Sequence, residues 1–194
     1  MEEELIKKAI ARDSGAIEAL YDRHAPPLLS VCYRYCGNRS DAEDILHDGF
    51  IKIIQKIGTF KIRSEGSLEA WMRRIMVNTA LNFLRDRMKE KNLIDIDPIL
   101  DKIDLHEEDE EDTEGIYLEL GKERIMEIIC ELPTGYRTVF NLYVFEQYGH
   151  KEIAEMLKCS ENTSKSQLSK ARVLLRKKIN QLVNIKPSPT YEKI

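Results

Sequence analysis

Two helical patterns separated by a short break lie between His150 and Arg176, and they restrict the possible folds more than any other stretch. The first is an apolar stripe of about two turns, which predicts a short helix; it contains Ile153, Ala154 and Leu157. Residues 158–160 interrupt the stripe and end at Ser160, a residue type that favours a helix N-cap. The second predicts a longer helix with a buried seam, formed by Ser164, Leu168, Ala171 and Leu175. Two helices joined by a turn of about three or four residues form a helix-turn-helix.

The outer face of the longer helix carries small or flexible polar side chains, namely Lys165, Ser166, Ser169, Lys170, Arg172 and Arg176. Such groups can donate hydrogen bonds to phosphates and base edges in a DNA major groove. The segment from Glu161 to Lys178 contains six basic residues and one acid, a net charge of +5. This one-sided charge indicates nucleic-acid binding. The alternative is an ordinary helical hairpin with a solvated basic face.

The net charge of −4 over 194 residues conceals an uneven distribution. Residues 92–115 contain eleven acids and one base, which leaves +6 for the rest of the chain. Few Gly and Pro residues, with 42% hydrophobic and 33% charged residues, indicate a helix-rich protein. We therefore predict an all-α fold with two small helical domains, 1–91 and 116–184, an acidic linker at 92–115 and a tail at 185–194.

Several classes of protein are disfavoured by what the sequence lacks. No apolar run approaches the roughly 18 residues of a membrane span, and the acidic start is unlike a signal peptide, so a cytoplasmic protein is expected. The cysteines, Cys32, Cys36, Cys130 and Cys159, contain no CxxC pair, and the histidines are scattered. We expect no metal or other cofactor, and we interpret the cysteines as buried small hydrophobic residues.

The first half of the chain predicts a series of amphipathic helices. A short helix spans 3–11, and Asp13 or Ser14 caps the next, which ends at Gly37 and Asn38. Pro26 and Pro27 are expected to break or kink that helix.

Ser40 and Glu43 predict a capping box at the start of a helix that reaches residue 57. Its predicted buried residues are Ile45, Leu46, Ile53, Ile54 and Ile57, and its predicted outer face holds Asp44, His47, Asp48, Ile51, Lys52 and Gln55. An apolar Ile51 among acids and amides is typical of a protein interface. The alternative is a harmless exposed isoleucine.

Residues 58–66 predict a loop, after which Ser67 is expected to cap a long helix. Its predicted buried side consists of Leu68, Trp71, Ile75, Val77, Leu81 and Leu84. From Lys61 to Lys91 there are eight bases and four acids, with Phe60, Trp71 and Phe83 interleaved. Cations for phosphates and rings for base stacking suit a single strand of nucleic acid.

The C-terminal part is predicted as a four-helix domain. A helix from about residue 116 to Cys130 precedes Leu132-Pro133-Thr134, which stops it and caps a helix over 135–146. The helix-turn-helix follows and extends to about Val183.

The order of these parts resembles the bacterial RNA polymerase sigma factors of the extracytoplasmic-function group, in the sigma-70 family, over nearly the whole chain. The resemblance is carried by SDAEDILHDGFIKII, by GSLEAWMRRIMVNTALNFLRDR and by LPTGYRTVFNLYVFEQYGHKEIAEMLKCSENTSKSQLSKAR. It implies a first domain that binds core polymerase and opens the −10 promoter element, and a second that reads the −35 element. It also implies an anti-sigma factor, often membrane-anchored, as a further partner.

The resemblance assigns roles to the candidate residues. The contacts to core polymerase would come from Asp44, Asp48, Ile51 and Gln55. Asn78 stands where the family holds a flipped base, with the 59–66 loop completing the pocket, and an amide offers both a donor and an acceptor. The full candidate set for the −10 element is Asn78, Asn82, Arg85, Arg63, Lys61 and Trp71; that for the −35 element is Lys165, Ser166, Ser169, Lys170, Arg172 and Arg176.

The chain departs from the family pattern within the helix-turn-helix. Ser164 stands where an aliphatic residue is usual, so its hydroxyl weakens packing unless it finds a partner. Lys158 stands where Gly is frequent, and a left-handed lysine costs about 1 kcal/mol. Gln167 and Ser169 replace residues that are often Arg or aromatic, so promoter preference is not transferable.

We therefore predict a promoter-specificity subunit with no enzymatic activity and no small-molecule substrate. A free-standing helix-turn-helix regulator is the main alternative, and it predicts specific duplex binding without polymerase. An enzyme acting on nucleic acid would need carboxylates or metal ligands facing a cleft, whereas the acids cluster at 92–115. A pure protein-interaction adaptor would leave the basic recognition face without a role.

Overall fold

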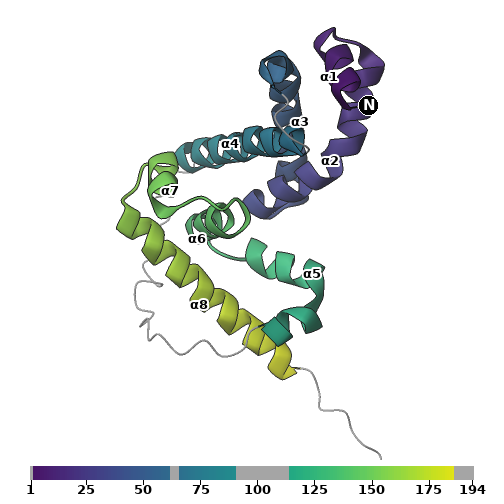
Figure 1. Cartoon of the computed structure of the whole chain (residues 1–194). Helices are drawn as coiled ribbons and strands as arrows, with labels where there is room; N and C mark the ends of the chain where they lie inside the picture. Colours follow the sequence, from purple (N-terminus) through teal and green to yellow (C-terminus); the bar gives the residue numbers. More distant parts are fainter. Residues whose placement is uncertain (1, 62–65, 91–113, 186–194) are drawn as a thin grey trace, which may run out of the picture. The chain divides into compact units, whose positions relative to one another are not determined.

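The computed structural model describes residues 2–61, 66–90 and 114–185, with only the backbone for 88–90, 114–120, 122 and 183–185. Within these ranges the regular elements are helical, which confirms the predicted all-α class. The chain divides into two compact units, Met1–Ile94 and Asp95–Ile194. Figure 1 shows the helices of both units. The acidic segment 92–115 and the tail 185–194 lie outside the described residues, apart from Glu114, Gly115 and Ile185, which are helical.

Unit 1 consists of α1 (Glu2–Ile10), α2 (Ser14–Cys36), α3 (Arg39–Lys56), the short 3-10 turn η1 (Ile57–Thr59) and α4 (Ser67–Glu90). Helices α2, α3 and α4 pack against one another, and α1 lies against α2 and η1. The largest fully buried side chains of this core include Leu20, Tyr35, Ile45, Ile53, Met72 and Met76. Burying each aliphatic side chain contributes about 1.5–3 kcal/mol, so the three-helix core fixes how α3 and α4 face solvent.

The ends of α2 explain where α3 begins. Asp13 caps α2 as predicted, because its Oδ1 accepts a hydrogen bond from the Ala16 N–H at 2.8 Å. Gly37 is left-handed with φ 76°, and its N–H donates to the Tyr33 carbonyl. Asn38 is then extended, and its Oδ1 accepts from the Asp41 N–H at 2.9 Å. The predicted capping box at Ser40 is therefore wrong, since Asn38 caps α3 and Ser40 lies within its first turn.

Of the break or kink expected at Pro26 and Pro27, the break is wrong, because α2 continues through both residues. Proline has no N–H to donate, so the carbonyls four residues earlier, on Asp22 and Arg23, lack their helical hydrogen bonds. All four residues are exposed, so water can solvate those carbonyls. The buried side of the helix, including Leu20, Leu28 and Val31, keeps its packing, which offsets the lost bonds.

Of the six residues predicted to be buried on α4, Leu68, Val77 and Leu84 are buried and the other three are not. The buried apolar residues of α4 are Leu68, Met72, Met76, Val77, Ala80 and Leu84, whereas Trp71, Ile75 and Leu81 are only half-buried. Met76 packs over Gly49 of α3, where a Cβ would overlap the Met76 thioether. Ser67 is the first helical residue rather than the cap, because the Gly66 carbonyl accepts the first helical bond, from the Ala70 N–H.

Unit 2 contains α5 (Glu114–Cys130), α6 (Thr134–Phe140), a π-helical turn η3 (Asn141–Phe145), α7 (His150–Leu157) and α8 (Glu161–Ile185). Gly121 interrupts α5 with φ 72° and ψ 155°, so the single predicted helix is two. Within the predicted Leu132-Pro133-Thr134 boundary, Pro133 is the N-cap of α6, and its carbonyl accepts from the Arg137 N–H. The predicted helix over 135–146 therefore becomes α6 followed by η3.

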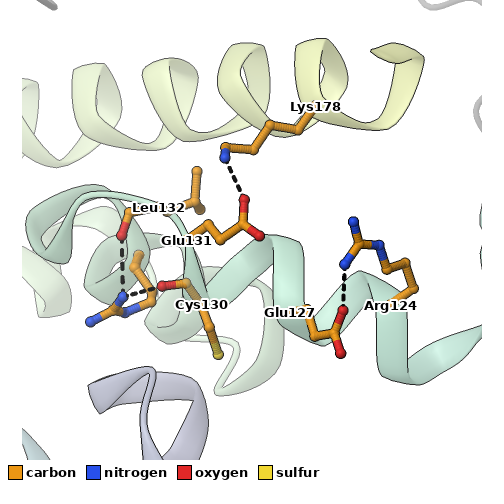
Figure 2. A network of polar contacts seen from close by, with 7 residues as sticks. Arg124, Glu127, Cys130, Glu131, Leu132 and Lys178 are labelled. Carbon is orange, nitrogen blue, oxygen red and sulfur yellow. Dashed lines mark hydrogen bonds and ion pairs between the residues drawn. The ribbon is translucent and has the colours of Figure 1, made fainter. Parts of the chain in front are cut away.

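The core of unit 2 joins α5 to α8 through Ile128, Ile129, Leu132, Ala171, Leu175 and Ile179. Figure 2 shows the polar contacts around it. Lys178 pairs with Glu131 at 2.5 Å, which lowers the pKa of that carboxyl. The buried Arg137 donates to the carbonyls of Cys130 and Leu132 and so completes the C-terminal end of α5.

Among the residues that the structure describes, no helix combines the length and apolarity that crossing a bilayer requires. The four cysteines are free thiols, and Cys32 alone is fully buried, while Cys36, Cys130 and Cys159 are half-buried. The interpretation of the cysteines as buried hydrophobic residues is thus correct for Cys32. Burial is the main cause that raises the pKa of the Cys32 thiol to about 12.

We predict that Cys32 reacts with iodoacetamide at pH 8 far more slowly than Cys36, since the thiolate is the reactive form and burial disfavours it. Peptide mass mapping of the partly alkylated native protein measures both rates. In guanidinium chloride the two cysteines should react alike. Equal rates in the native protein would contradict the buried position of Cys32.

Candidate nucleic-acid and protein interfaces

The turn between α7 and α8 is held by backbone and hydroxyl hydrogen bonds. Lys158 is left-handed with φ 56° and ψ 44°, as the family resemblance implies for this turn, and its N–H donates to the Ala154 carbonyl. The Cys159 N–H also donates to that carbonyl at 3.1 Å. Ser160 caps α8 as predicted, because its Oγ accepts from the Thr163 N–H at 2.9 Å. These bonds fix the crossing of the two helices, which forms a helix-turn-helix.

The predicted seam of α8 is buried throughout, from Ser164 and Leu168 to Ala171 and Leu175. The Ser164 hydroxyl, fully buried, lies 2.9 Å from Nδ1 of His150 on α7. The departure from an aliphatic residue at this position is therefore compensated by a side-chain partner. A hydrogen bond of this kind contributes about 1 kcal/mol and also fixes the orientation of the imidazole ring.

The outer face of α8 presents the residues that the sequence assigned to DNA. Lys165, Ser166, Ser169, Arg172 and Arg176 are exposed, and Lys170 is half-buried. Lys165 pairs with Glu161 at 2.8 Å, and this lysine lowers the pKa of the Glu161 carboxyl. The pair is exposed, so it contributes little to stability, and a phosphate can compete with the carboxylate for the lysine.

Sequence reasoning missed an aromatic contribution to this surface from η3. Tyr143 is 36% exposed and stacks on the His150 ring, with centroids 4.8 Å apart. The Arg172 guanidinium lies 5.8 Å from the centroid of the Tyr143 ring, within the range of a cation–π contact. No helical periodicity predicts this cluster, because the π-helical turn changes the direction of Tyr143.

In unit 1, one face of α4 gathers the candidate −10 residues. Trp71, Asn78, Asn82 and Arg85 follow one another at seven, four and three positions, so they share one side of a helix. Asn78, Asn82 and Arg85 are exposed, as is Lys61, which precedes α4 in the sequence. Trp71 is half-buried against Phe60, with ring centroids 5.3 Å apart. Arg63 lies outside the described residues.

The candidate polymerase residues form a stripe along α3. Asp44, Asp48, Ile51 and Gln55 are spaced by four, three and four residues, and all four are exposed. Ile51 is 56% exposed, the largest exposed fraction among the big apolar side chains described. Burying the Ile51 side chain against a partner would remove apolar surface from water and so stabilise the complex, whereas in its exposed position the side chain contributes no such stabilisation.

A groove between α3 and α4 connects the two sets of candidates. It encloses about 310 Å³ and is lined by Ile45, Asp48, Lys52, Thr79, Asn82, Phe83, Asp86 and Arg87. Asp48 from the α3 stripe and Asn82 from the α4 face thus share one depression. Lys52 crosses it, and its ammonium donates to the Thr79 hydroxyl at 3.4 Å. The two surfaces of unit 1 are neighbours, which the sequence alone did not predict.

The left-handed Lys158 gives a test of the turn geometry. We predict that Lys158→Gly stabilises unit 2 by about 0.5–1 kcal/mol, because glycine adopts this conformation without a Cβ clash. Lys151→Gly is the matched control: Lys151 is exposed in α7, and there glycine should destabilise by about 1 kcal/mol. Urea unfolding followed by circular dichroism measures both. Destabilisation of similar size in both variants would exclude a strained turn.

Comparison with known proteins matches both units. Residues 20–90 match the family model described as Sigma-70 region 2. Residues 122–175 match the model described as Sigma-70, region 4.

The chain is also similar to curated sigma factors over most of its length. The chain is 28% identical to the ECF RNA polymerase sigma-E factor of Haemophilus influenzae, with 92% of this chain and 95% of the relative covered. It is also 28% identical to the ECF RNA polymerase sigma factor SigW of Bacillus subtilis, over 93% of this chain and 100% of that protein.

Among solved structures, the chain is similar to the sigma factor RpoE in complex with the anti-sigma factor NepR from Bartonella quintana. The TM-score is 0.48 and the identity 20%, with 88% of this chain and 98% of that chain covered. The two family matches together span more than half of the sequence, one on each unit. The chain therefore belongs to the sigma-70 family of RNA polymerase sigma factors, with relatives in its extracytoplasmic-function group.

Proposed function

We propose that this sigma factor binds core RNA polymerase through the α3 stripe and reads two promoter elements, one with each unit. In this proposal α8 reads the −35 element, while the exposed face of α4 captures the −10 element as a single strand. The observation that supports the proposal is that most members of each sequence-assigned set share one side of a helix: Asp44, Asp48, Ile51 and Gln55 on α3, Asn78, Asn82 and Arg85 on α4, and the −35 candidates on α8. No covalent chemistry is involved, and the protein acts in the cytoplasm together with the polymerase.

The −35 contact is supported by the buried seam of α8. Because Leu168, Ala171 and Leu175 fix the rotation of the helix, Ser169 and Arg172 must face outward together. The flexible cations suit phosphates, and a guanidinium can donate two hydrogen bonds to a guanine edge. Tyr143 limits the positions that Arg172 can occupy, which lowers the entropy lost when Arg172 binds a base or phosphate.

Melting of the −10 element is supported by the amides and rings of unit 1. Asn78 can offer a donor and an acceptor to the pairing edge of a flipped base. The Phe60–Trp71 pair lies on the same unit and offers a ring for stacking, which is worth about 1–3 kcal/mol per base. Capture of the unpaired strand thus offsets an unpairing cost of a few kcal/mol.

A further partner of the proposal is an anti-sigma factor that covers these surfaces until a signal releases the protein. The solved relatives include CnrH in complex with the cytosolic domain of CnrY, and RpoE in complex with the anti-sigma factor NepR. An inhibitor for this chain would compete with polymerase for the exposed Ile51 and with promoter DNA for α8. A membrane anchor for that inhibitor is part of the same proposal.

A free-standing regulator is the second candidate, because the helix-turn-helix is complete on its own in unit 2. It differs from a sigma factor in one measurable way. The regulator binds duplex promoter DNA specifically without polymerase. The sigma factor selects promoters only when core polymerase is present, and a gel-shift assay with and without core enzyme separates the two.

We predict that Ile51→Glu weakens binding to core polymerase by about thirtyfold, the size of a hot-spot loss of about 2 kcal/mol. Fluorescence titration of labelled protein with core enzyme measures the Kd. Ile10→Glu is the matched control, because Ile10 is also exposed but lies on α1 and not on α3. Equal losses in the two variants would exclude a specific role for Ile51.

We predict that Asn78→Ala lowers the rate of open-complex formation by about tenfold while leaving polymerase binding unchanged, because it removes hydrogen bonds made only to an unpaired base. Permanganate footprinting of the −10 region measures opening. Asn180→Ala, at an exposed position on α8, serves as the control. A template with a preformed bubble should restore most of the loss, and failure to do so would place the defect elsewhere.

We predict that Arg172→Ala lowers transcription from an intact promoter about tenfold and has little effect on a template with a scrambled −35 element. In vitro transcription on both templates, with both proteins, forms a double-mutant cycle. Lys8→Ala removes an exposed cation from α1 and controls for net charge. If Arg172→Ala reduces transcription from both templates by the same factor, Arg172 contributes only its charge and does not recognise the −35 element.

A further inference from the structure

One histidine of unit 1 is buried without a hydrogen-bond partner. His24 on α2 is 4% exposed, and its Nε2 has no partner among the described residues. Its Nδ1 lies 4.0 Å from the Glu69 carboxylate, which is too far for a hydrogen bond. A buried polar atom without a partner typically costs about 1–3 kcal/mol, so this imidazole requires an explanation.

Two carboxylates from other helices lie beside this imidazole. Glu2 of α1, His24 of α2 and Glu69 of α4 each place a potential ligand atom within 4.8 Å of the other two. Glu2 is half-buried, whereas the Glu69 side chain is 48% exposed and can rotate toward the imidazole. Three side chains from three different helices converge here, although they are separated by 22 and 45 positions in the sequence.

The electrostatic surroundings of His24 are mixed. Burial is the main cause that lowers the pKa of His24, with a smaller contribution from the exposed Arg23, while Glu69 and Glu2 act in the opposite direction. The ring nitrogen that faces Glu69 is Nδ1, so Nδ1 is the atom that could bind an ion between the two carboxylates, while Nε2 stays buried on the ring.

We propose that Glu2, His24 and Glu69 form a binding site for a first-row transition-metal dication such as Zn²⁺, with water completing the coordination. Zinc accepts one imidazole nitrogen and two carboxylate oxygens at about 2.0–2.2 Å, so neighbouring ligand atoms in a tetrahedral site are about 3.4 Å apart. The present separations require inward rotation of two glutamate side chains. The nitrogen ligand favours zinc over Mg²⁺, which prefers oxygen ligands.

Such an ion would join α1 to the three-helix core of unit 1. Helix α1 is only nine residues long, and its buried apolar residues are Ile6 and Ala9. An ion held by Glu2 at its first turn, and by α2 and α4, would add a crosslink where apolar contacts are few. Because the ligands converge only in the folded protein, binding of the ion would also stabilise that fold.

The test uses the full chain, Zn²⁺ and isothermal titration calorimetry. We expect one zinc site whose Kd is weakened about tenfold or more in Glu69→Gln and in Glu2→Gln. These ligands are exposed or half-buried, so both variants should fold even if His24→Gln does not. Glu18→Gln and Glu3→Gln are matched controls on exposed positions of α2 and α1 and should leave the Kd unchanged.

Two further measurements separate this site from binding by the thiols or by the acidic segment 92–115. Zinc should raise the Tm of the parent protein and not that of Glu69→Gln. Co²⁺ bound at the site should give visible absorption without a thiolate charge-transfer band. An unchanged Kd in Glu69→Gln, a thiolate band, or displacement of zinc by excess Mg²⁺ would each overturn the proposal.

Discussion

Every candidate surface in this protein depends on the burial of an apolar stripe on the opposite side of the same helix. Leu168, Ala171 and Leu175 hold the rotation of α8, and Leu68, Met72 and Met76 hold that of α4. Each buried aliphatic side chain contributes about 1.5–3 kcal/mol, more than any single exposed ion pair on these faces. If α8 rotated about its axis by one residue position, its apolar stripe would become exposed and Arg172 would leave the outer face. The packing of α8 therefore also determines which residues are available for recognition.

The helix-turn-helix could be predicted closely because its signals are local. The seam from Ser164 to Leu175 and the cap at Ser160 follow from residue types over short distances, whereas the left-handed turn at Lys158 is what the family resemblance implies. The partner of the Ser164 hydroxyl could not be predicted in this way. His150 is fourteen positions earlier, and only the crossing of α7 over α8 brings its Nδ1 to the serine.

Unit 1 shows where one-dimensional patterns fail. Helix α4 has two adjacent apolar stripes, and the buried one includes Met76, which packs over Gly49 in another helix. The start of α3 was missed because Asn38 satisfies the helix end before Ser40 is reached. The prolines of α2 were given too much weight, since the carbonyls that they leave without helical partners are on the solvent side. In each case tertiary context decides between options that the local sequence leaves nearly equal.

The close approach at Gly49 also sets the lateral spacing of α3 and α4. Gly49 contributes no side chain there, so the Met76 thioether occupies the space that a Cβ would need. Close-packed protein interiors are hardly compressible, so a displacement of one helix also displaces the helix packed against it. In the proposed function, α3 binds polymerase and α4 binds the unpaired strand. A displacement of α3 by the enzyme would therefore also move Asn78 and Asn82 on α4.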